Sequence, residues 1–203
     1  MYRYITWFQE NYPRLKEEMA ACDHNYDHRN LNPYHLESDC WSHTMMVCKM
    51  AEINHCDKVV QIAALLHDIG KPSARKVNPR NNHIQFFGHE KLSAQRAEEI
   101  LLSMREEGMI DRTEKKEIIK LIAHHSFLYL HPDIEDLLDA FDRDLSFCIH
   151  LVEVSRCDNQ GRFCSDTIDD AIYRNMLDDL HSRQEMEMNR IPAKRHHSKK
   201  IYR

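Results

Sequence analysis

The stretch LLHDIGK, residues 65–71, constrains the fold of this chain more than any other. An apolar run at residues 62–66 overlaps its start and predicts one buried face of a helix. His67 and Asp68 then stand side by side, just before a Gly-Lys-Pro sequence of the kind that ends helices. Burying an unpaired carboxylate costs several kcal/mol or more, so Asp68 requires partners from elsewhere in the chain.

Composition and periodicity predict an all-α fold. Only 4 of the 203 residues are glycine and 42% are hydrophobic, which favours a helical globular protein over a β-sandwich or barrel. The only strand candidate is HIQFF, residues 83–87. We expect a bundle of about seven or eight helices. Their expected ranges are one or two helices within 3–21, then Asp39 to about Asn54, Asp57 to Gly70, 90–107, 112–125, 133–141, 142–158 and 168–188.

Charge divides the chain into an acidic body and a basic end. Of the 28 basic residues six follow residue 189, so residues 1–189 carry 22 basic and 33 acidic groups, a net charge of −11. Such a body is not a nucleic-acid-binding surface by charge. We expect a helical segment at 1–30 that packs on the core, a main domain at 31–188 and a basic tail at 189–203. The tail is either a solubilising end or a weak contact for phosphate or RNA.

Other features predict a cytoplasmic protein without a membrane partner. No apolar run approaches the roughly 20 residues that cross a bilayer. The first residues, MYRYITWFQENYPRLKEE, carry charges and aromatic rings throughout, unlike a signal peptide. The seven cysteines are odd in number and form no CxxC pair, which is typical of free thiols in a reducing compartment.

Histidine and aspartate recur at the ends or inner faces of the other expected helices. His43 lies on the helix before the HD pair, and His89 opens the helix after it. His124 and His125 end an apolar helix, and Asp158 ends another. Helical proteins build metal sites from side chains that converge in this way. Nine further histidines are interpreted as structural: His24, His28, His55, His83, His131, His150, His181, His196 and His197.

Imidazole and carboxylate ligands without thiolates fit hard-to-borderline divalent cations. Neighbouring helix residues point about 100° apart, so His67 and Asp68 can straddle a pair of metal ions. Taken singly, each histidine also fits a hydrogen-bonded core residue, and a His-His pair at a helix end also complements the helix dipole. The first predicted ligand set is His43, His67, Asp68 and Asp158, and the second is His89, His124 and His125, with Asp68 bridging.

The same residues, in this order, resemble the HD-domain superfamily of metal-dependent phosphohydrolases. The similarity is closest to the HD domain of bacterial tRNA nucleotidyltransferases and poly(A)-polymerase-like proteins, and it spans roughly residues 31–165. The matching blocks are NPYHLESDCWSHT (32–44), AALLHDIGKP (63–72), FFGHEKLSAQRAEEIL (87–102), LIAHH (121–125) and DNQGR (158–162). The resemblance implies an HD-domain helical bundle, free-standing because no nucleotidyltransferase head is expected before residue 31.

The resemblance also implies metal-assisted attack of water on phosphorus. A bound metal ion can lower the pKa of water from about 15.7 to near 7. We expect two divalent ions, of Mn, Mg, Ni, Co or Fe. Many HD nucleotidases carry a Glu where this chain has Gly70 and Lys71, which weakens the transfer of their mechanism. The block LI..H favours His125 as the ligand, but families with a His-His pair use both, so His124 and His125 stay open.

Asp68 and Lys71 are the predicted catalytic residues. Lys71 follows His67 by four residues and Asp68 by three, so it is assigned to a substrate phosphate oxygen, with a solvent-facing lysine as the alternative. Further predicted substrate-binding residues are Arg75, Lys76, Arg80 and Arg162.

The expected function is hydrolysis of a phosphate ester of a small nucleotide, either 2′,3′-cyclic or terminal, by a metal-activated hydroxide. A basic loop beside an acidic body suits a small polyanion or an RNA end better than duplex nucleic acid. Two alternatives remain. One is a diiron oxygenase of the same superfamily, which the HDIGKP and GHE..SA blocks disfavour. The other is a nucleotide-sensing regulatory module without turnover, which the intact ligand set disfavours.

Overall fold

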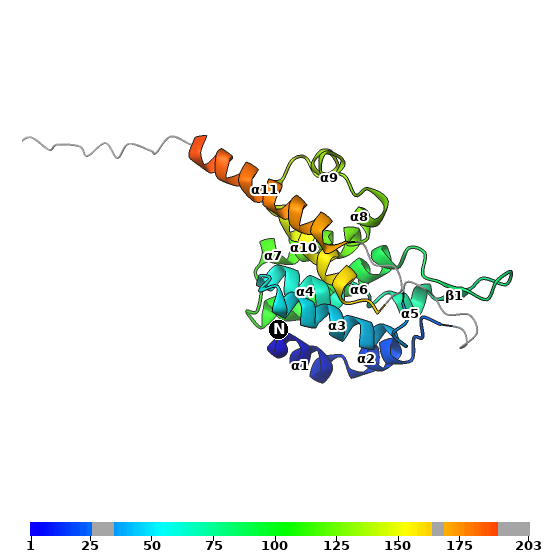
Figure 1. Ribbon diagram of the computed structural model, residues 1–203. Helices are drawn as coiled ribbons and strands as arrows, with labels where there is room; N and C mark the ends of the chain where they lie inside the picture. Colours follow the sequence, from blue (N-terminus) through cyan, green and yellow to red (C-terminus); the bar gives the residue numbers. More distant parts are fainter. Residues whose placement is uncertain (26–34, 164–168, 191–203) are drawn as a thin grey trace, which may run out of the picture.

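The computed structural model describes residues 1–25, 35–163 and 169–190, without the side chain of Arg190. The predicted all-α class is confirmed, with nine helices of seven residues or more and two single-turn helices in the described residues. They are α1 (Tyr2–Asn11), α2 (Pro13–Ala20), α3 (Cys40–Ile53), α4 (Lys58–Leu66), α5 (Lys71–Ala74), α6 (His89–Glu106), α7 (Arg112–His124), α8 (Phe127–Leu130), α9 (Ile134–Ala140), α10 (Leu145–Gln160) and α11 (Asp170–Arg190). Figure 1 shows their arrangement.

Aspartate side chains fix where many of these helices begin. Each accepts hydrogen bonds from backbone N–H groups of the first turn, which otherwise lack partners. The caps predicted at Asp39 and Asp57 are confirmed. The helix expected from residue 142 begins instead at Leu145, because Asp142 adopts a left-handed φ of 54° before the cap at Asp144. The capping aspartates are Asp39, Asp57, Asp111, Asp133 and Asp144.

Helix α10 is the centre of the bundle. It packs against α3, α4, α7 and α11, and eleven of its sixteen residues are buried. Helices α3 and α4 also pack against each other, as the cyan ribbons beside yellow α10 show in Figure 1. Because α3, α4 and α10 share one core, polar side chains on their inner faces are forced close together.

Two glycines allow backbones to approach closely beside this core. A Cβ atom on Gly70 would lie 2.4 Å from the backbone nitrogen of Ser93 in α6. A Cβ atom on Gly161 would lie 2.7 Å from the backbone nitrogen of Val47 in α3. Any larger residue would therefore push α6 away from the end of α4, or α3 away from the end of α10.

Residues 71–88, between the helices expected at 57–70 and 90–107, contain α5 and a small antiparallel hairpin. Strand β1 (Lys76–Val77) pairs with β2 (Ile84–Gln85), which lies inside the predicted HIQFF strand. The hairpin projects from the bundle in Figure 1, and the chain returns through Phe86 and Phe87 to the start of α6.

The N-terminal helices lie against the bundle. Helix α1 packs on α4, and α2 packs on α3 and the single-turn α5, with Tyr4, Phe8 and Met19 buried. Part of the predicted 1–30 segment and nearly all of the predicted basic tail at 189–203 lie outside the described residues. Across the described helices, none combines the length and apolarity that a membrane span requires.

Candidate metal centre

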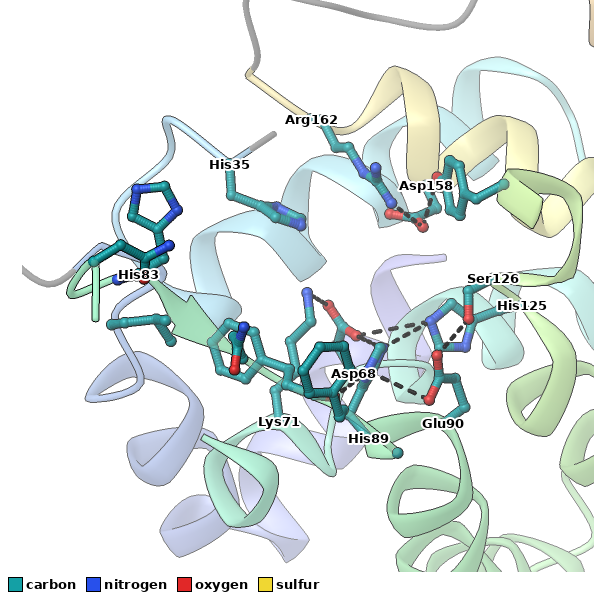
Figure 2. A pocket seen from close by; sticks show the side chains of 17 residues that line it. His35, Asp68, Lys71, His83, His89, Glu90, His125, Ser126, Asp158 and Arg162 are labelled. Carbon is teal, nitrogen blue, oxygen red and sulfur yellow. Dashed lines mark hydrogen bonds and ion pairs between the residues drawn. The ribbon is translucent and has the colours of Figure 1, made fainter. Parts of the chain in front are cut away.

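Asp68 lies at the meeting point of four imidazole rings. Its Oδ2 is 3.2 Å from His67 Nε2 and 3.6 Å from His43 Nε2. Its Oδ1 is 3.3 Å from His89 Nε2 and 3.9 Å from His125 Nε2. The two carboxylate oxygens thus face two different pairs of histidines, as the sequence predicted for a bridging aspartate. Figure 2 shows Asp68 between His89, His125 and the cavity.

Asp158, on α10, joins the first of these pairs. Its Oδ1 lies 3.0 Å from His43 Nε2 and 3.9 Å from His67 Nε2. Its Oδ2 accepts hydrogen bonds from Tyr129 Oη and from Arg162, each at 2.9 Å. One oxygen therefore faces the histidines while the other is held by the surrounding protein.

The ring orientation of three histidines leaves bare lone pairs directed at Asp68. Nδ1 of His67, His89 and His125 donates to the carbonyl oxygens of Ala64, Phe86 and Ile122, at 2.8, 2.9 and 2.8 Å. A carbonyl can only accept, so Nδ1 carries a proton, and in the neutral ring Nε2 then offers its lone pair. Nevertheless His89 Nε2 and His125 Nε2 lie only 3.2 Å apart.

This arrangement fits divalent cations. Two groups of three side chains, sharing Asp68, each offer donor atoms within 4.8 Å of one another. Facing lone pairs repel each other unless a cation lies between them. Both Asp68 oxygens are buried and neither accepts a well-formed hydrogen bond from the described residues, although Oδ2 forms an ion pair with Lys71 at 2.7 Å. The two groups are His43, His67 and Asp68, and Asp68, His89 and His125.

The electrostatics keep three of the donors, Asp68, Asp158 and His125, in their metal-binding forms. Burial by itself raises the pKa of Asp68, but the charges of His67 and Lys71 outweigh it and hold that pKa well below its usual range. Burial likewise raises the pKa of Asp158, and the Arg162 guanidinium leads the effects that depress it. Burial, then the charges of His67 and His89, lower the pKa of His125 to about 3. Both aspartates are therefore carboxylates, and His125 is neutral.

The structure separates the two neighbouring histidines at the end of α7. His125 is 2% exposed and points to Asp68, whereas His124 is exposed and its ring packs edge-on against Phe141, 5.1 Å away. Successive residues of a helical turn point about 100° apart, so one cluster cannot receive both. His124 is thus corrected from candidate ligand to surface residue.

Lys71 is not solvent-facing, so that alternative is wrong. The side chain is buried, and Nζ lies 2.7 Å from Asp68 Oδ2 and 3.5 Å from His24 Nε2. Burial lowers the pKa of Lys71, but Asp68 more than restores it, so the ammonium stays charged. The sequence placed Lys71 beside the site but did not reveal its ion pair with Asp68.

An open cavity of about 640 Å³ lies above the cluster, a volume typical of small-ligand sites. Asp68, His89 and His125 line it, together with Phe86 and the 82% exposed Phe87. Figure 2 shows Arg162 and Asp158 across the cavity from Asp68.

Only one of the four additional basic residues reaches this cavity. Arg162 lines it, with its guanidinium 4.2 Å over the Tyr129 ring and a buried Nε that has no hydrogen-bond partner among the described residues. Arg75, Lys76 and Arg80 are exposed and do not line it, so their predicted placement in the site is corrected. They lie on or beside the hairpin, which carries their side chains away from the cluster.

Sequence reasoning missed three residues around the cluster. Tyr129 holds Asp158, and its place one helical turn after His125 was an unused signal. His35, which lines the cavity, and buried Glu37 both lie within the NPYHLESDCWSHT block. The sequence shows that both residues precede His43, but it does not show the direction in which their side chains point.

Comparison with known proteins agrees with this geometry. The model of the HD domain family matches residues 40–159, from the first residue of α3 into the last turn of α10 and over more than half of the chain. A comparison with curated proteins gave no match. The matched range includes all the clustered histidines and both aspartates described above. The chain therefore belongs to the HD-domain superfamily of metal-dependent phosphohydrolases.

Proposed function

We propose that this protein hydrolyses a phosphate ester of a small nucleotide, either a 2′,3′-cyclic or a terminal phosphate, with the help of two divalent metal ions. The observation that carries the proposal is the placement of Asp68. Each of its oxygens faces a separate histidine pair, at the floor of a cavity large enough for a nucleotide.

The residues divide into two ligand sets that share Asp68. His43, His67 and Asp158 complete the first set, and His89 and His125 complete the second. Ions held there supply Lewis-acid chemistry and lower the pKa of bound water. Nitrogen and carboxylate donors suit Mn, Fe, Co or Ni better than Mg, which prefers oxygen ligands.

Lys71 and Arg162 would bind the substrate phosphate. Both side chains line the cavity, and each already pairs with one of the two aspartates. The cationic side chains thus balance the carboxylates, so bound divalent ions leave the site positive and attractive to an anion. The unpartnered Nε of Arg162 and the ammonium of Lys71 are suitable donors to phosphate oxygens.

The cavity wall suits a nucleoside better than a bare phosphate. Phe86 and Phe87 line it between the hairpin and α6, and Tyr129 lines it beside Arg162. Flat aromatic rings stack on nucleobases of any sequence, with roughly 1–3 kcal/mol per base. The exposed face of Phe87 is therefore well placed to receive a base while the phosphate points to Asp68.

The test is turnover by the metal-loaded protein on a panel of nucleotides, 2′,3′-cyclic nucleotides and base-free phosphate esters. We expect Mn²⁺ or Co²⁺ to bind with a stoichiometry of two per chain, and His89→Gln to remove one ion and leave the other. His124→Gln is the matched control, since that ring lies outside the cluster. Metal binding with nucleotide binding but no turnover would favour a sensing module, and oxygen consumption by the iron-loaded protein would favour an oxygenase.

A further inference from the structure

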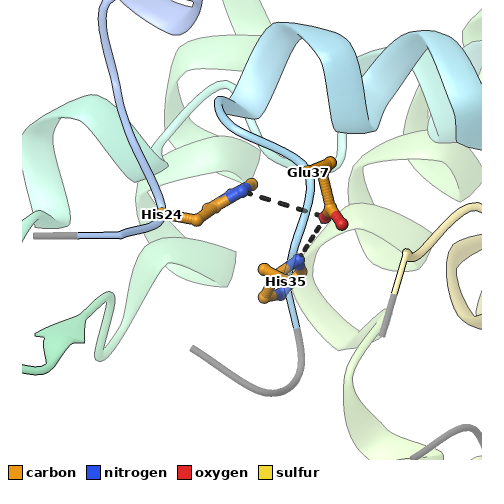
Figure 3. A group of neighbouring side chains, drawn as sticks. All are labelled: His24, His35 and Glu37. Atoms are coloured by element: carbon orange, nitrogen blue, oxygen red, sulfur yellow. Dashed lines mark hydrogen bonds and ion pairs between the residues drawn. The ribbon is translucent and has the colours of Figure 1, made fainter. Parts of the chain in front are cut away.

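Glu37, just before α3, is a buried acid surrounded by three imidazole rings. Its Oε1 lies 2.6 Å from His35 Nδ1, 3.1 Å from His43 Nδ1 and 3.8 Å from His24 Nδ1. Figure 3 shows Glu37 between His24 and His35. Glu37 is 7% exposed, and among these neighbours His43 alone belongs to the metal-ligand set described above.

The other oxygen of Glu37 is anchored to the backbone just beyond the end of α10. Oε2 accepts a hydrogen bond from the backbone N–H of Phe163 at 2.9 Å. The neighbouring Leu36 N–H donates to the carbonyl of Phe163 at 2.7 Å. Phe163 follows Gln160, the last residue of α10, by three positions, so these bonds tie the Glu37 segment to the chain just beyond the helix that carries Asp158. The position of the carboxylate is thus set by the backbone.

His43 differs from the other clustered histidines in how its Nδ1 is satisfied. Nδ1 of His67, His89 and His125 donates in each case to the carbonyl three residues earlier, which is accessible because those rings lie at helix ends. His43 lies inside α3, and the carbonyl three residues before it, that of Cys40, already accepts from Thr44 Oγ1 at 2.8 Å. Its partner has to come from outside the helix.

Glu37 supplies the only acceptor near that nitrogen among the described residues. The contact of 3.1 Å is less well aligned than the three carbonyl bonds, and His43 Nδ1 has no other partner there. The other partners of Glu37 are the His35 ring at 2.6 Å and the backbone N–H of Phe163, which fix the place of its side chain. A carboxylate acceptor makes an imidazole a stronger ligand than a carbonyl does, because it increases the electron density on the ring.

We propose that Glu37 is a positioning residue for the metal centre. By accepting the Nδ1 proton of His43, it turns the Nε2 lone pair of that ring toward Asp68 and Asp158 and strengthens it as a ligand. The inference rests on the proposed metal centre and concerns only the first ligand set. It also links His43 to His35, since one oxygen accepts from both rings and His35 lines the cavity.

An alternative interpretation is that His24, His35 and Glu37 form a separate ion site. His24, His35 and Glu37 offer donor atoms within 4.8 Å of one another. However, His35 and Glu37 are already joined at hydrogen-bond distance, and the Lys71 ammonium lies 3.5 Å from His24. A further cation beside Lys71 would be repelled, so the hydrogen-bonding role is favoured.

The test compares metal affinities of the purified wild type and Glu37→Gln, measured with Co²⁺ against a chromophoric chelator. We expect one of the two ions to bind roughly 10- to 100-fold more weakly in the variant, while the other is unchanged. The absorption bands of bound Co²⁺ should change at the weakened site. Glu117→Gln is the matched control, because Glu117 also accepts from a histidine Nδ1, that of His150 at 2.6 Å, but lies outside the cluster.

Wild-type affinity for both ions in Glu37→Gln would overturn the proposal. Three ions in the wild type and two in the variant would overturn it in favour of a ligand role. Failure of the wild type to bind any metal would overturn the metal centre too, whereas metal binding without phosphate hydrolysis would overturn only the proposed function.

A measurement on the wild type keeps the test independent of how the variant folds. In ¹⁵N spectra of the histidine rings of the protein loaded with diamagnetic Zn²⁺, we expect His43 Nδ1 to carry a proton, with the downfield signal of a proton shared with a carboxylate. A His43 Nδ1 without a proton in the metal-loaded protein would contradict the proposal.

Discussion

Asp68 connects the two halves of the proposed metal centre, since each of its oxygens faces a different pair of imidazoles. Removing its charge while keeping its shape, in Asp68→Asn, should lower the affinity for both ions by more than the roughly 10- to 100-fold typical of outer-shell changes. Hydrolysis should be lost with the metal. Metal analysis and turnover assays check this, with the surface variant Asp139→Asn as the control. Full activity in Asp68→Asn would refute the assignment.

Lys71 has a different task from the ligands, because a protonated amine cannot bind a metal ion. Lys71→Ala should keep both ions and lower the rate of phosphate ester hydrolysis. A hydrogen bond to a charged group contributes roughly 1.5–3 kcal/mol, or about 10- to 150-fold in rate. Steady-state kinetics beside metal analysis checks this, and exposed Lys76→Ala should behave as the wild type. Rates within twofold of the wild type would move the phosphate contact to Arg162.

At the scale of helices, the site depends on where α4, α6 and α7 end or begin. His67 and His125 directly follow the last residues of α4 and α7, and His89 is the first residue of α6. There each Nδ1 reaches a carbonyl of the same turn, which orients the opposite nitrogen inward. The ends of helices therefore aim the ligands, and the packing of one helix against another sets their distances.

Gly70 controls one of these distances. A Cβ atom there would clash with the backbone of α6, including the carbonyl oxygen of His89 at 2.6 Å. Gly70→Ala should therefore lower the free energy of unfolding by roughly 1–3 kcal/mol. It should also weaken the ion held by His89 more than the ion held by His43. Urea denaturation and metal titration test this, with the exposed Ser73→Ala as the control. An unchanged affinity for the ion held by His89 would show that α6 can shift without moving His89.

At the scale of the whole molecule, a partly exposed cluster of one histidine and two acids joins three helices away from the cavity. His150 on α10 lies 3.1 Å from Asp57, the cap of α4, and 2.6 Å from Glu117 on α7. Burial lowers the pKa of His150, but its bonds to these two acids outweigh it and raise the pKa to about 10. Glu153, whose pKa is raised by burial, also interacts with His150.

A raised folded-state pKa means that protonation of His150 stabilises the fold. The stabilisation should be complete below the unfolded pKa of about 6.5 and should disappear as the pH rises through about 10. His150→Gln should thus lower the free energy of unfolding by roughly 1–2 kcal/mol at pH 6, allowing for partial exposure, and by little above pH 10. Urea denaturation at both pH values measures it. A difference independent of pH would contradict the role of the charge.

Much of this molecule was predictable from short stretches of sequence. The helical class, the aspartate caps before α3 and α4 and the ordered blocks of the HD family all depend on residues close together in the chain. The clustering of His43, the HD pair, His89 and Asp158 was predictable because each marks a helix end or an inner face. Single-turn α8 was missed, since four residues carry too little periodic signal.

Only the tertiary structure decided which side chains meet. Helix period alone left His124 and His125 equivalent, and the packing of α7 against α4 and α10 directs His125 inward. Arg75, Lys76 and Arg80 looked suitable by charge, but the hairpin carries them away from the cavity. Glu37 is recognisable as a partner of His43 only in the fold, where the backbone N–H of Phe163 holds its other oxygen. Short-range patterns determine the helices and their residue types, whereas the packing of helices that are distant in the sequence determines which of those side chains meet.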